Sequence, residues 1–182
     1  MHVKSDVRLF YFYIMNESIT FMSRIYQLDY LMNVRYLEVT KDTIERLGGS
    51  LKVRLLCTVN DSITFQCGLM ALSGGNAYIT LNKKYLKQLG VELGDEVQVK
   101  LIKDESEYGM EMSSELSEWL AQDIEAKTKF DELSPGKQRY IIYYVNGVKS
   151  PLKRMERTSL LMENLKRMKG KFSFRFLLGK ED

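Results

Sequence analysis

A thirteen-residue segment occurs twice in this chain of 182 residues, and any fold must accommodate both copies. Residues 36–48 read YLEVTKDTIERLG and residues 78–90 read YITLNKKYLKQLG, so the offset is a constant 42 residues without a gap. A related strand follows each copy, KVRL at residues 52–55 and QVKL at residues 98–101. The recurrence indicates one structural unit used twice, and it predicts pseudo-two-fold symmetry.

Each copy carries the signals of a strand that leads into a short helix. Thr40 and Asn82 are suited to the N-cap, where a side-chain oxygen accepts a hydrogen bond from a free amide of the first turn. Apolar residues spaced three apart then seat the helix on a core. Gly48 and Gly90 fit the left-handed backbone conformation that ends many helices.

Strand signals fill the rest of the region between residues 21 and 103. The stretch between the copies predicts a β-hairpin that turns at residues 60–62, and apolar residues alternate with polar ones after residue 95. Short strands of this kind leave exposed edges unless the sheet closes on itself. We therefore predict an α+β protein, in which a small, closed β-barrel precedes an α-helical C-terminal module.

Helix signals dominate after the barrel. Ser114 is a predicted N-cap of one helix. The Ser-Pro pairs at residues 134–135 and 150–151 predict the starts of two more, because proline fits the first helical position. Trp119, the only tryptophan, is expected to anchor the first of these helices to the barrel. The predicted apolar stripes are Leu116, Leu120 and Ile124 in the first helix, and Leu152, Met155, Met162, Leu165 and Met168 in the last, which is expected to reach Gly170.

Charge is distributed unevenly over these helices. Residues 104–132 contain ten acids and two bases, whereas residues 137–171 contain ten bases and two acids. A basic face beside exposed Arg139 and Tyr143 is suited to contacting phosphates, with tyrosines as stacking surfaces. The simpler interpretation is that these cations are solvated or pair with the acidic block. The candidate binding residues are Lys83, Lys84, Lys87, Arg139, Tyr143, Lys149, Lys153, Arg154, Arg157, Lys166 and Arg167.

The segment that joins the barrel to the helices is a second candidate site. Asp104, Ser106 and Tyr108 are candidates for lining a groove between the two parts. The alternative is a structural turn in which Gly109 supplies an unusual backbone angle.

Familiar catalytic and metal-binding patterns are missing from the sequence. His2 is the only histidine, which removes Ser-His-Asp arrangements and histidine-based zinc sites, and no Gly-rich phosphate loop occurs. Cys57 and Cys67 each fall on an apolar face of an alternating strand, which predicts two core thiols; a metal or redox pair is the alternative. We expect no cofactor, no metal and no enzymatic activity.

The N-terminal stretch LFYFYIM, residues 9–15, has the composition of a short signal segment. Polar residues 16–18 interrupt it, and it is too short to span a bilayer. We therefore expect a cytoplasmic protein without a membrane partner, and Met22 is a second possible start of the native chain. The predicted organisation is an N-terminal extension (1–20), a barrel domain (21–103), a linker (104–113), a helical region (114–171) and a tail (172–182).

Two family resemblances rest on these motifs. The segment ITLNKKYLKQLGVELGDEVQVKL, residues 79–101, is similar to the strand–turn–strand unit of the bacterial AbrB, MazE and MraZ proteins, in which two chains share one double-split barrel. The ordered motifs YLEV, LNKKYLKQLGVELGDEV, KDESEYGMEM and LSPGKQRYIIYYV resemble the domain of unknown function 1905 family, in members with a C-terminal YdeI/OmpD-associated, bacteriocin-protection region. The first resemblance implies a double-split barrel that this one chain completes with its own two units. The second implies the same barrel fold and no established reaction.

Two functional hypotheses remain open. The first is a non-enzymatic binding module that touches nucleic acid through residues 149–171 and the lysines of residues 83–87. The alternative is a protein-interaction or stress- and bacteriocin-protection factor without a nucleic-acid role. Measuring how retention on DNA and RNA changes with salt concentration separates the two, because phosphate neutralisation makes binding strongly salt-dependent.

Overall fold

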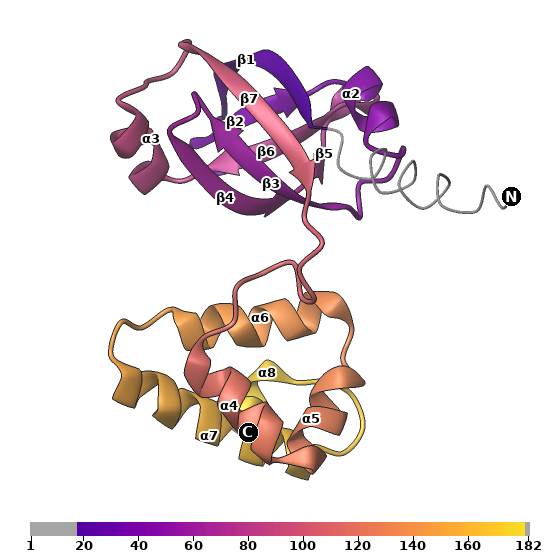
Figure 1. Cartoon of the computed structure of the whole chain (residues 1–182), viewed down its shortest axis with the longest axis vertical. Coiled ribbons are helices and arrows are strands. Elements are labelled where there is room, and N and C mark those ends of the chain that lie inside the picture. Colours follow the sequence, from indigo (N-terminus) through magenta and orange to yellow (C-terminus); the bar gives the residue numbers. More distant parts are fainter. Residues whose placement is uncertain (1–17, 181–182) are drawn as a thin grey trace, which may run out of the picture. The chain divides into compact units, whose positions relative to one another are not determined.

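The computed structural model describes residues 18–180, which divide after Glu105 into two compact units (Figure 1). The first unit is built around a β-sheet and the second is helical, so the predicted α+β class is confirmed. Within residues 18–180, no helix combines the length and the apolar composition that crossing a membrane requires.

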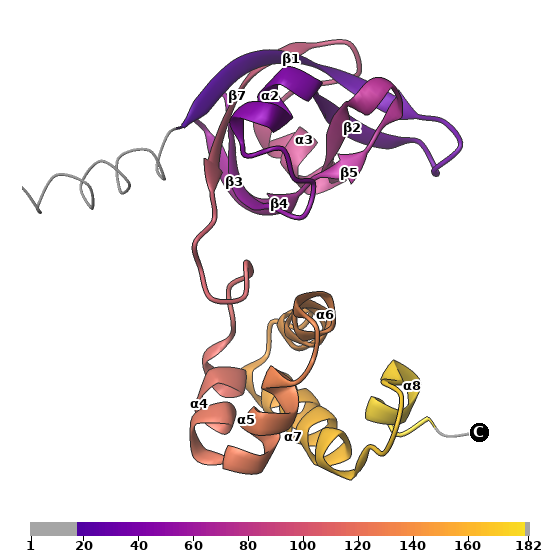
Figure 2. The ribbon, with the colours of Figure 1, turned by 90° about the vertical axis from the view of Figure 1, so that its right-hand side faces the viewer.

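Seven antiparallel strands form the sheet of the first unit, in the order β4-β3-β7-β1-β2-β6-β5. The edge strands β4 and β5 are consecutive in the chain and only Leu69 separates them, so the sheet curls to bring its edges together. The result is a half-barrel (Figure 2). Its elements are β1 (Ile19–Leu28), β2 (Val34–Val39), α2 (Lys41–Arg46), β3 (Arg54–Val59), β4 (Ile63–Gly68), β5 (Met70–Ala71), the 3-10 turn η1 (Ser73–Gly75), β6 (Ala77–Leu81), α3 (Lys83–Leu89) and β7 (Glu96–Lys103).

The strand registers agree with the repeated sequence. β2 pairs with β6 so that Leu37 lies opposite Ile79, its counterpart 42 residues later. β3 pairs with β7 so that Leu56 lies opposite Ile102, which continues the alignment of KVRL with QVKL. A local two-fold axis would produce both registers. The internal duplication and the closed double-split barrel nevertheless stay predictions.

Both short helices of the first unit begin as predicted. The Thr40 side chain accepts a hydrogen bond from the Thr43 amide at 3.4 Å, and the Asn82 side chain accepts one from the Tyr85 amide at 2.8 Å. These contacts satisfy amides that have no partner inside the helix. Gly90 ends α3 with a φ of 66°, a left-handed conformation that glycine adopts without steric cost.

The core of the first unit lies on the inner face of the curled sheet. Alternate residues of β3 illustrate it, because Leu55, Cys57 and Val59 are fully buried while their neighbours are half-buried. The predicted hairpin between β3 and β4 is also confirmed. Asn60 and Asp61 turn the chain there with φ values of 50° and 48°, which these two residue types tolerate.

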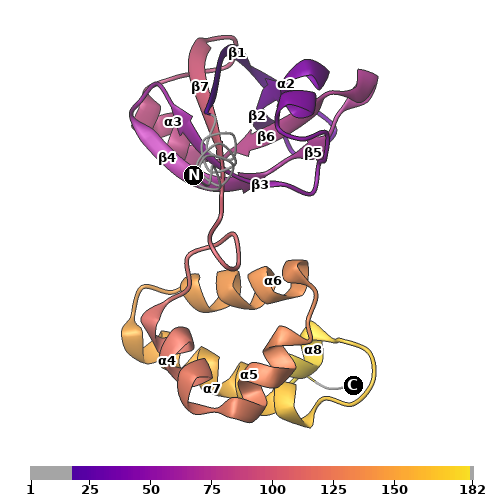
Figure 3. The ribbon, with the colours of Figure 1, turned by 45° about the vertical axis from the view of Figure 1, so that its right-hand side comes forward.

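Helix α7 is the central element of the second unit. It packs against each of the other four helices (Figure 3). The predicted starts at both Ser-Pro pairs are confirmed, with proline in the first turn of α6 and α7. The predicted cap of the first helix is wrong by one residue, because Ser113 is the N-cap of α4 and Ser114 is its first helical residue. The helices are α4 (Ser114–Gln122), α5 (Ile124–Asp131), α6 (Pro135–Asn146), α7 (Pro151–Arg167) and α8 (Phe174–Leu177). The largest fully buried side chains are Leu116, Phe130, Ile141, Ile142, Leu161, Met162 and Leu165.

The predicted stripe of the first helix is wrong at Ile124. The helix breaks at Asp123, whose carboxylate caps α5 by accepting a hydrogen bond from the Ala126 amide at 2.9 Å. The break turns Ile124 outward, where it is 81% exposed. Trp119 packs against the helical core of its own unit, and its anchoring to the barrel stays a prediction.

The predicted stripe of the last helix is correct only in its second half. Met162 and Leu165 are buried, whereas Leu152 is 69% exposed. The first turns of α7 face α4 through Arg154, which leaves Leu152 on the solvent side. The helix ends at Arg167 and does not reach Gly170.

Candidate binding surfaces

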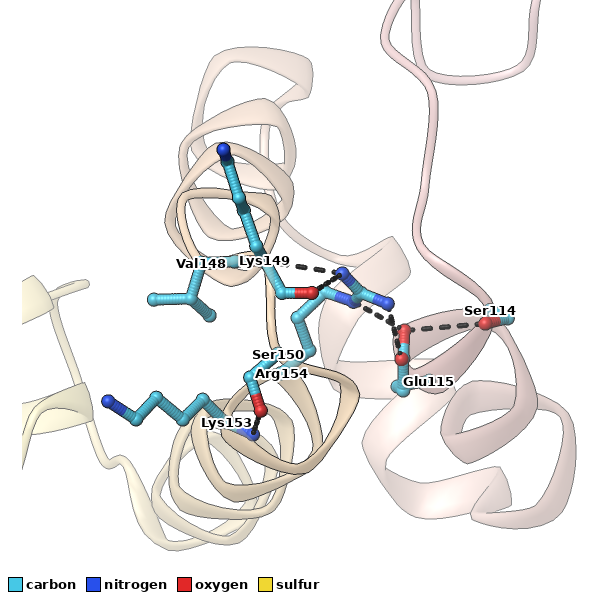
Figure 4. A network of polar contacts seen from close by, with 7 residues as sticks. All are labelled: Ser114, Glu115, Val148, Lys149, Ser150, Lys153 and Arg154. Carbon is cyan, nitrogen blue, oxygen red and sulfur yellow. Dashed lines mark hydrogen bonds and ion pairs between the residues drawn. The ribbon is translucent and has the colours of Figure 1, made fainter.

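Arg154, a candidate phosphate-binding residue, forms hydrogen bonds inside the second unit with all three of its guanidinium nitrogens. Its guanidinium donates to both carboxylate oxygens of Glu115 on α4, each at 2.8 Å (Figure 4). Its remaining nitrogen donates to the backbone oxygens of Lys149 and Val148 at 3.0 and 3.4 Å. The Arg154 side chain is 23% exposed and that of Glu115 only 10%. Mainly because of the hydrogen bonds from Arg154, the pKa of Glu115 falls from the usual 4.5 to about 2.

Two further cations of α7 also have internal partners. Lys166 contacts the Asp123 carboxylate at 2.7 Å and that of Glu163 at 2.9 Å, and the hydrogen bond to Asp123 is the main reason why the pKa of Lys166 is raised. Arg157 lies over the Tyr144 ring, 4.2 Å from its centroid, and donates to the Tyr144 backbone oxygen. The acidic block therefore pairs with two cations of the basic face, Arg154 and Lys166, which agrees in part with the simpler sequence interpretation.

The other sequence candidates lie in several places. Arg139 was predicted to be exposed but is half-buried, with its guanidinium 3.4 Å from the Tyr108 backbone oxygen. Tyr143 is 66% exposed, as predicted. The candidates that are exposed and form no ion pair with another described residue are Lys149, Lys153 and Arg167 on or beside α7, and Lys83, Lys84 and Lys87 on α3.

The structure places the predicted groove residues in different units. Asp104 belongs to the sheet unit, where it accepts a hydrogen bond from the Gln66 side chain at 2.9 Å. Tyr108 belongs to the helical unit, where its ring lies edge-on to Phe130. Gly109 has a φ of 61° and its amide donates to the Ser106 oxygen, which confirms the unusual backbone angle. The groove itself stays a prediction.

Both cysteines are free thiols that contribute to the first core, as predicted. Leu55 pairs with Cys67 and Cys57 with Phe65, so the two thiols are diagonal neighbours across β3 and β4. Within residues 18–180, no three His, Cys, Asp or Glu side chains gather as a metal site would require.

Sequence reasoning missed an apolar turn between β1 and β2. Tyr30 is 80% exposed, Met32 93% and Leu31 42%. The signal was available, because three large apolar residues follow one another in a segment that joins two strands. We call residues 30–32 the apolar turn.

Sequence reasoning also missed a hollow at the C-terminal end of α7, because residues 172–182 were taken as a tail. Its volume is about 480 Å³. The available signal was charge, since residues 167–180 hold five cations and no acid. We call it the basic hollow, and it is lined by Met168, Lys169, Lys171, Ser173, Arg175, Phe176 and Lys180.

Family models match both units of the chain. Residues 21–101 match a domain of unknown function, DUF1905, and residues 109–168 match the bacteriocin-protection, YdeI or OmpD-associated family. The chain joins a DUF1905 domain to a YdeI/OmpD-associated region. A search of curated proteins found no match.

The two matches coincide with the two units. The DUF1905 match begins in β1 and ends in β7, so it covers the curled sheet. The YdeI/OmpD-associated match ends at residue 168, so all but one of the residues around the basic hollow lie beyond it. Neither description names a reaction or a ligand, and the likeness to AbrB-type barrels stays a prediction.

Proposed function

We propose that this protein is a non-enzymatic binding protein whose DUF1905 domain docks a protein partner through the apolar turn. The exposure of Tyr30 and Met32 is the observation that carries the proposal. Contiguous apolar side chains on a protein surface commonly mark interaction sites, because their burial in a partner releases ordered water.

The apolar turn is held in shape by the strands that it joins. The Leu31 amide donates to the Leu28 oxygen at 3.2 Å, and the Val34 amide donates to the Leu31 oxygen at 3.1 Å. Met32 has a φ of 48°, in the left-handed region that is costly for residues with a Cβ. A defined turn presents its side chains with little ordering cost on binding.

An aromatic stack supports the base of the hairpin. The rings of Tyr26 and Tyr36 stack with centroids 5.4 Å apart, and Tyr78 meets Tyr36 edge-on at 5.5 Å. Tyr36 and Tyr78 form a small buried cluster with Leu28 on the sheet. This cluster fixes β1 and β2 where the apolar turn projects from them (Figure 2).

The chemistry of the turn favours an apolar protein surface over a polyanion. No lysine or arginine lies within residues 29–33, and the nearest charge in the sequence, Asp29, receives a hydrogen bond from Gln27. Aromatic residues and methionine are enriched at the centres of protein interfaces. We therefore expect a partner that offers an apolar groove for Tyr30 and Met32.

A photo-crosslinking amino acid at Tyr30 in living cells, followed by mass spectrometry, identifies the partner. Binding of the purified partner is then compared between the native chain, the Tyr30→Ser/Met32→Ser double variant and a control, Met70→Ser, which alters another exposed methionine. The double variant should weaken binding at least about tenfold, since two buried apolar side chains contribute roughly 3 kcal/mol or more.

Three outcomes would contradict this proposal. Crosslinks that form only between copies of the chain would make the occupant a second copy. Crosslinks confined to lipid would exclude a protein partner. Equal affinities of the double variant and the Met70→Ser control would show that the turn does not bind.

A second candidate function is nucleic-acid binding. Lys149, Lys153 and Arg167 favour it, because they are exposed and their side chains form no ion pair with another residue in the range 18–180. Substituting all three by glutamine should reduce the slope of log affinity against log salt by about two for single strands. The control is Lys41→Gln/Lys52→Gln in the first unit, which should leave that slope unchanged. Absence of binding at low salt would discard this candidate.

A further inference from the structure

The basic hollow owes its shape to two glycines. Gly170 stands between Lys169 and Lys171 with a φ of 84°, so the chain turns between the two lysines. Gly179 has a φ of 67°, and hydrogen bonds from the Gly179 and Lys180 amides to the oxygens of Phe176 and Arg175 close the end of α8. This is the Schellman arrangement, which folds the chain back after a helix and directs Lys180 toward the hollow.

The walls of the hollow are attached to the helical core. Leu177 is fully buried, and its backbone oxygen accepts a hydrogen bond from the Asn164 side chain of α7 at 3.1 Å. Phe174 packs edge-on against Tyr140 and Tyr144 of α6. The cations are therefore presented by an ordered scaffold.

The charges around the hollow have one sign. Lys169, Lys171 and Lys180 are exposed, and none forms an ion pair with another residue in the range 18–180. No acidic residue in that range lines the hollow. Neighbouring ammonium groups repel one another, so a bound anion would relieve an unfavourable arrangement.

The remaining lining groups suit oxygen-rich anions. The Ser173 hydroxyl accepts a hydrogen bond from the Phe176 amide at 3.3 Å, which leaves its own hydrogen free to donate. Ammonium groups combined with a hydroxyl donor match the several acceptor oxygens of a phosphate. The volume of about 480 Å³ falls within the range of small-ligand sites.

We propose that the basic hollow binds a phosphate group through Lys169, Lys171, Lys180 and Ser173. This site lies in the helical unit, so it goes beyond the protein-docking function proposed for the DUF1905 domain. The phosphate belongs either to a small phosphate ester or to the backbone of a nucleic acid, because both present the same oxygens.

Calorimetric titration of the full chain with tripolyphosphate at low ionic strength tests this site. The Lys169→Gln/Lys171→Gln variant should bind at least about tenfold more weakly, since each charged contact contributes substantially. The control, Lys41→Gln/Lys52→Gln, removes the same charge from the first unit and should stay within about twofold of the native chain. Gly179→Ala keeps every charge but strains the turn before Lys180, and it should also weaken binding.

If the lysine variant and the control lose tripolyphosphate affinity equally, the attraction depends on overall charge and the proposed site is wrong. Absence of tripolyphosphate binding by the native chain would also overturn the proposal. Glu181 and Asp182, which follow Lys180, lie outside the described residues. If tripolyphosphate binds only to a chain that ends at Lys180, the chain's own carboxylates occupy the hollow and the proposal is wrong.

Two competition arms distinguish the sources of the phosphate. Adenosine monophosphate that displaces tripolyphosphate, while an oligothymidylate does not, identifies a small phosphate ester. An oligothymidylate that competes with tripolyphosphate and loses affinity in Lys169→Gln/Lys171→Gln identifies a nucleic-acid backbone. Retention of tripolyphosphate by the Tyr30→Ser/Met32→Ser variant shows that this site and the apolar turn are separate.

Discussion

At the scale of single residues, Glu115 and Arg154 form an ion pair in the helical unit that is largely shielded from water. Two hydrogen bonds join them across α4 and α7. A charged group that loses its partner in such a place keeps its desolvation cost. The contact therefore matters more through the cost of breaking it than through its own attraction.

Glu115→Gln should lower the free energy of unfolding of the helical unit. The amide keeps the shape of the carboxylate but leaves the Arg154 guanidinium without a counter-charge. Urea unfolding followed by the fluorescence of Trp119, the only tryptophan, measures the effect. The control is Asp131→Asn, which removes the exposed partner of Lys127 and should cost less. If Glu115→Gln and Asp131→Asn lowered the free energy of unfolding equally, shielding from water would not explain the cost of losing the ion pair.

The lowered pKa of Glu115 predicts that the stability of the helical unit depends on pH. Because the pKa of Glu115 is about 2 in the folded chain and 4.5 is its usual value, the ionised group adds stability above pH 4.5. That contribution is lost as the pH falls from 4.5 toward 2. The native chain should therefore lose stability more steeply than Glu115→Gln in this window. The measurement is the unfolding midpoint, followed by Trp119 fluorescence, as a function of pH. Parallel profiles for the native chain and Glu115→Gln would contradict the assigned effect of Glu115.

The two thiols should differ in reactivity. A hydrogen bond with Cys67, and then burial, raise the pKa of the Cys57 thiol, and the thiolate is the form that reacts. Cys57 is also fully buried, whereas Cys67 is half-buried. Iodoacetamide followed by peptide mass spectrometry should label Cys67 first and Cys57 only on unfolding. Equal rates of labelling in the folded chain would contradict this order.

At the scale of elements, local chemistry was predictable and long-range partners were not. The caps at Thr40 and Asn82 follow from residue type at a helix start, because their partners lie three residues away. The break at Asp123 was missed, since the apolar spacing from Leu120 to Ile124 suits a continuous helix equally well. The pairing of Arg154 with a residue 39 positions earlier leaves no periodic signal.

The two caps give a matched prediction. Asn82→Ala and Thr40→Ala should each destabilise the first unit by about 1 kcal/mol, with the larger effect at Asn82 because its hydrogen bond is shorter. Far-UV circular dichroism during urea unfolding measures both. Gln88→Ala, an exposed change inside α3, is the control and should lie within about 0.5 kcal/mol of the native chain. If Gln88→Ala destabilised the chain as much as Asn82→Ala and Thr40→Ala, the stabilising role of the two caps would be contradicted.

At the scale of the whole molecule, each unit has a hydrophobic core of its own. The first core is built from β-strand residues with α2 and α3, and the second from α4 to α8. The family matches divide at the same place, between residues 101 and 109. A chain with two separate cores is expected to fold as two cooperative parts.

This organisation predicts that residues 106–182 fold without the sheet. The fragment is short, but chains of this size can fold when they hold a continuous apolar core, and fully buried Phe130, Ile141 and Leu161 supply one. Its Trp119-monitored unfolding midpoint should match that of the full chain, and Glu115→Gln should lower both equally. A fragment that shows no cooperative transition would mean that the second core depends on the first unit. In that case, the helical unit binds phosphate only as part of the full chain.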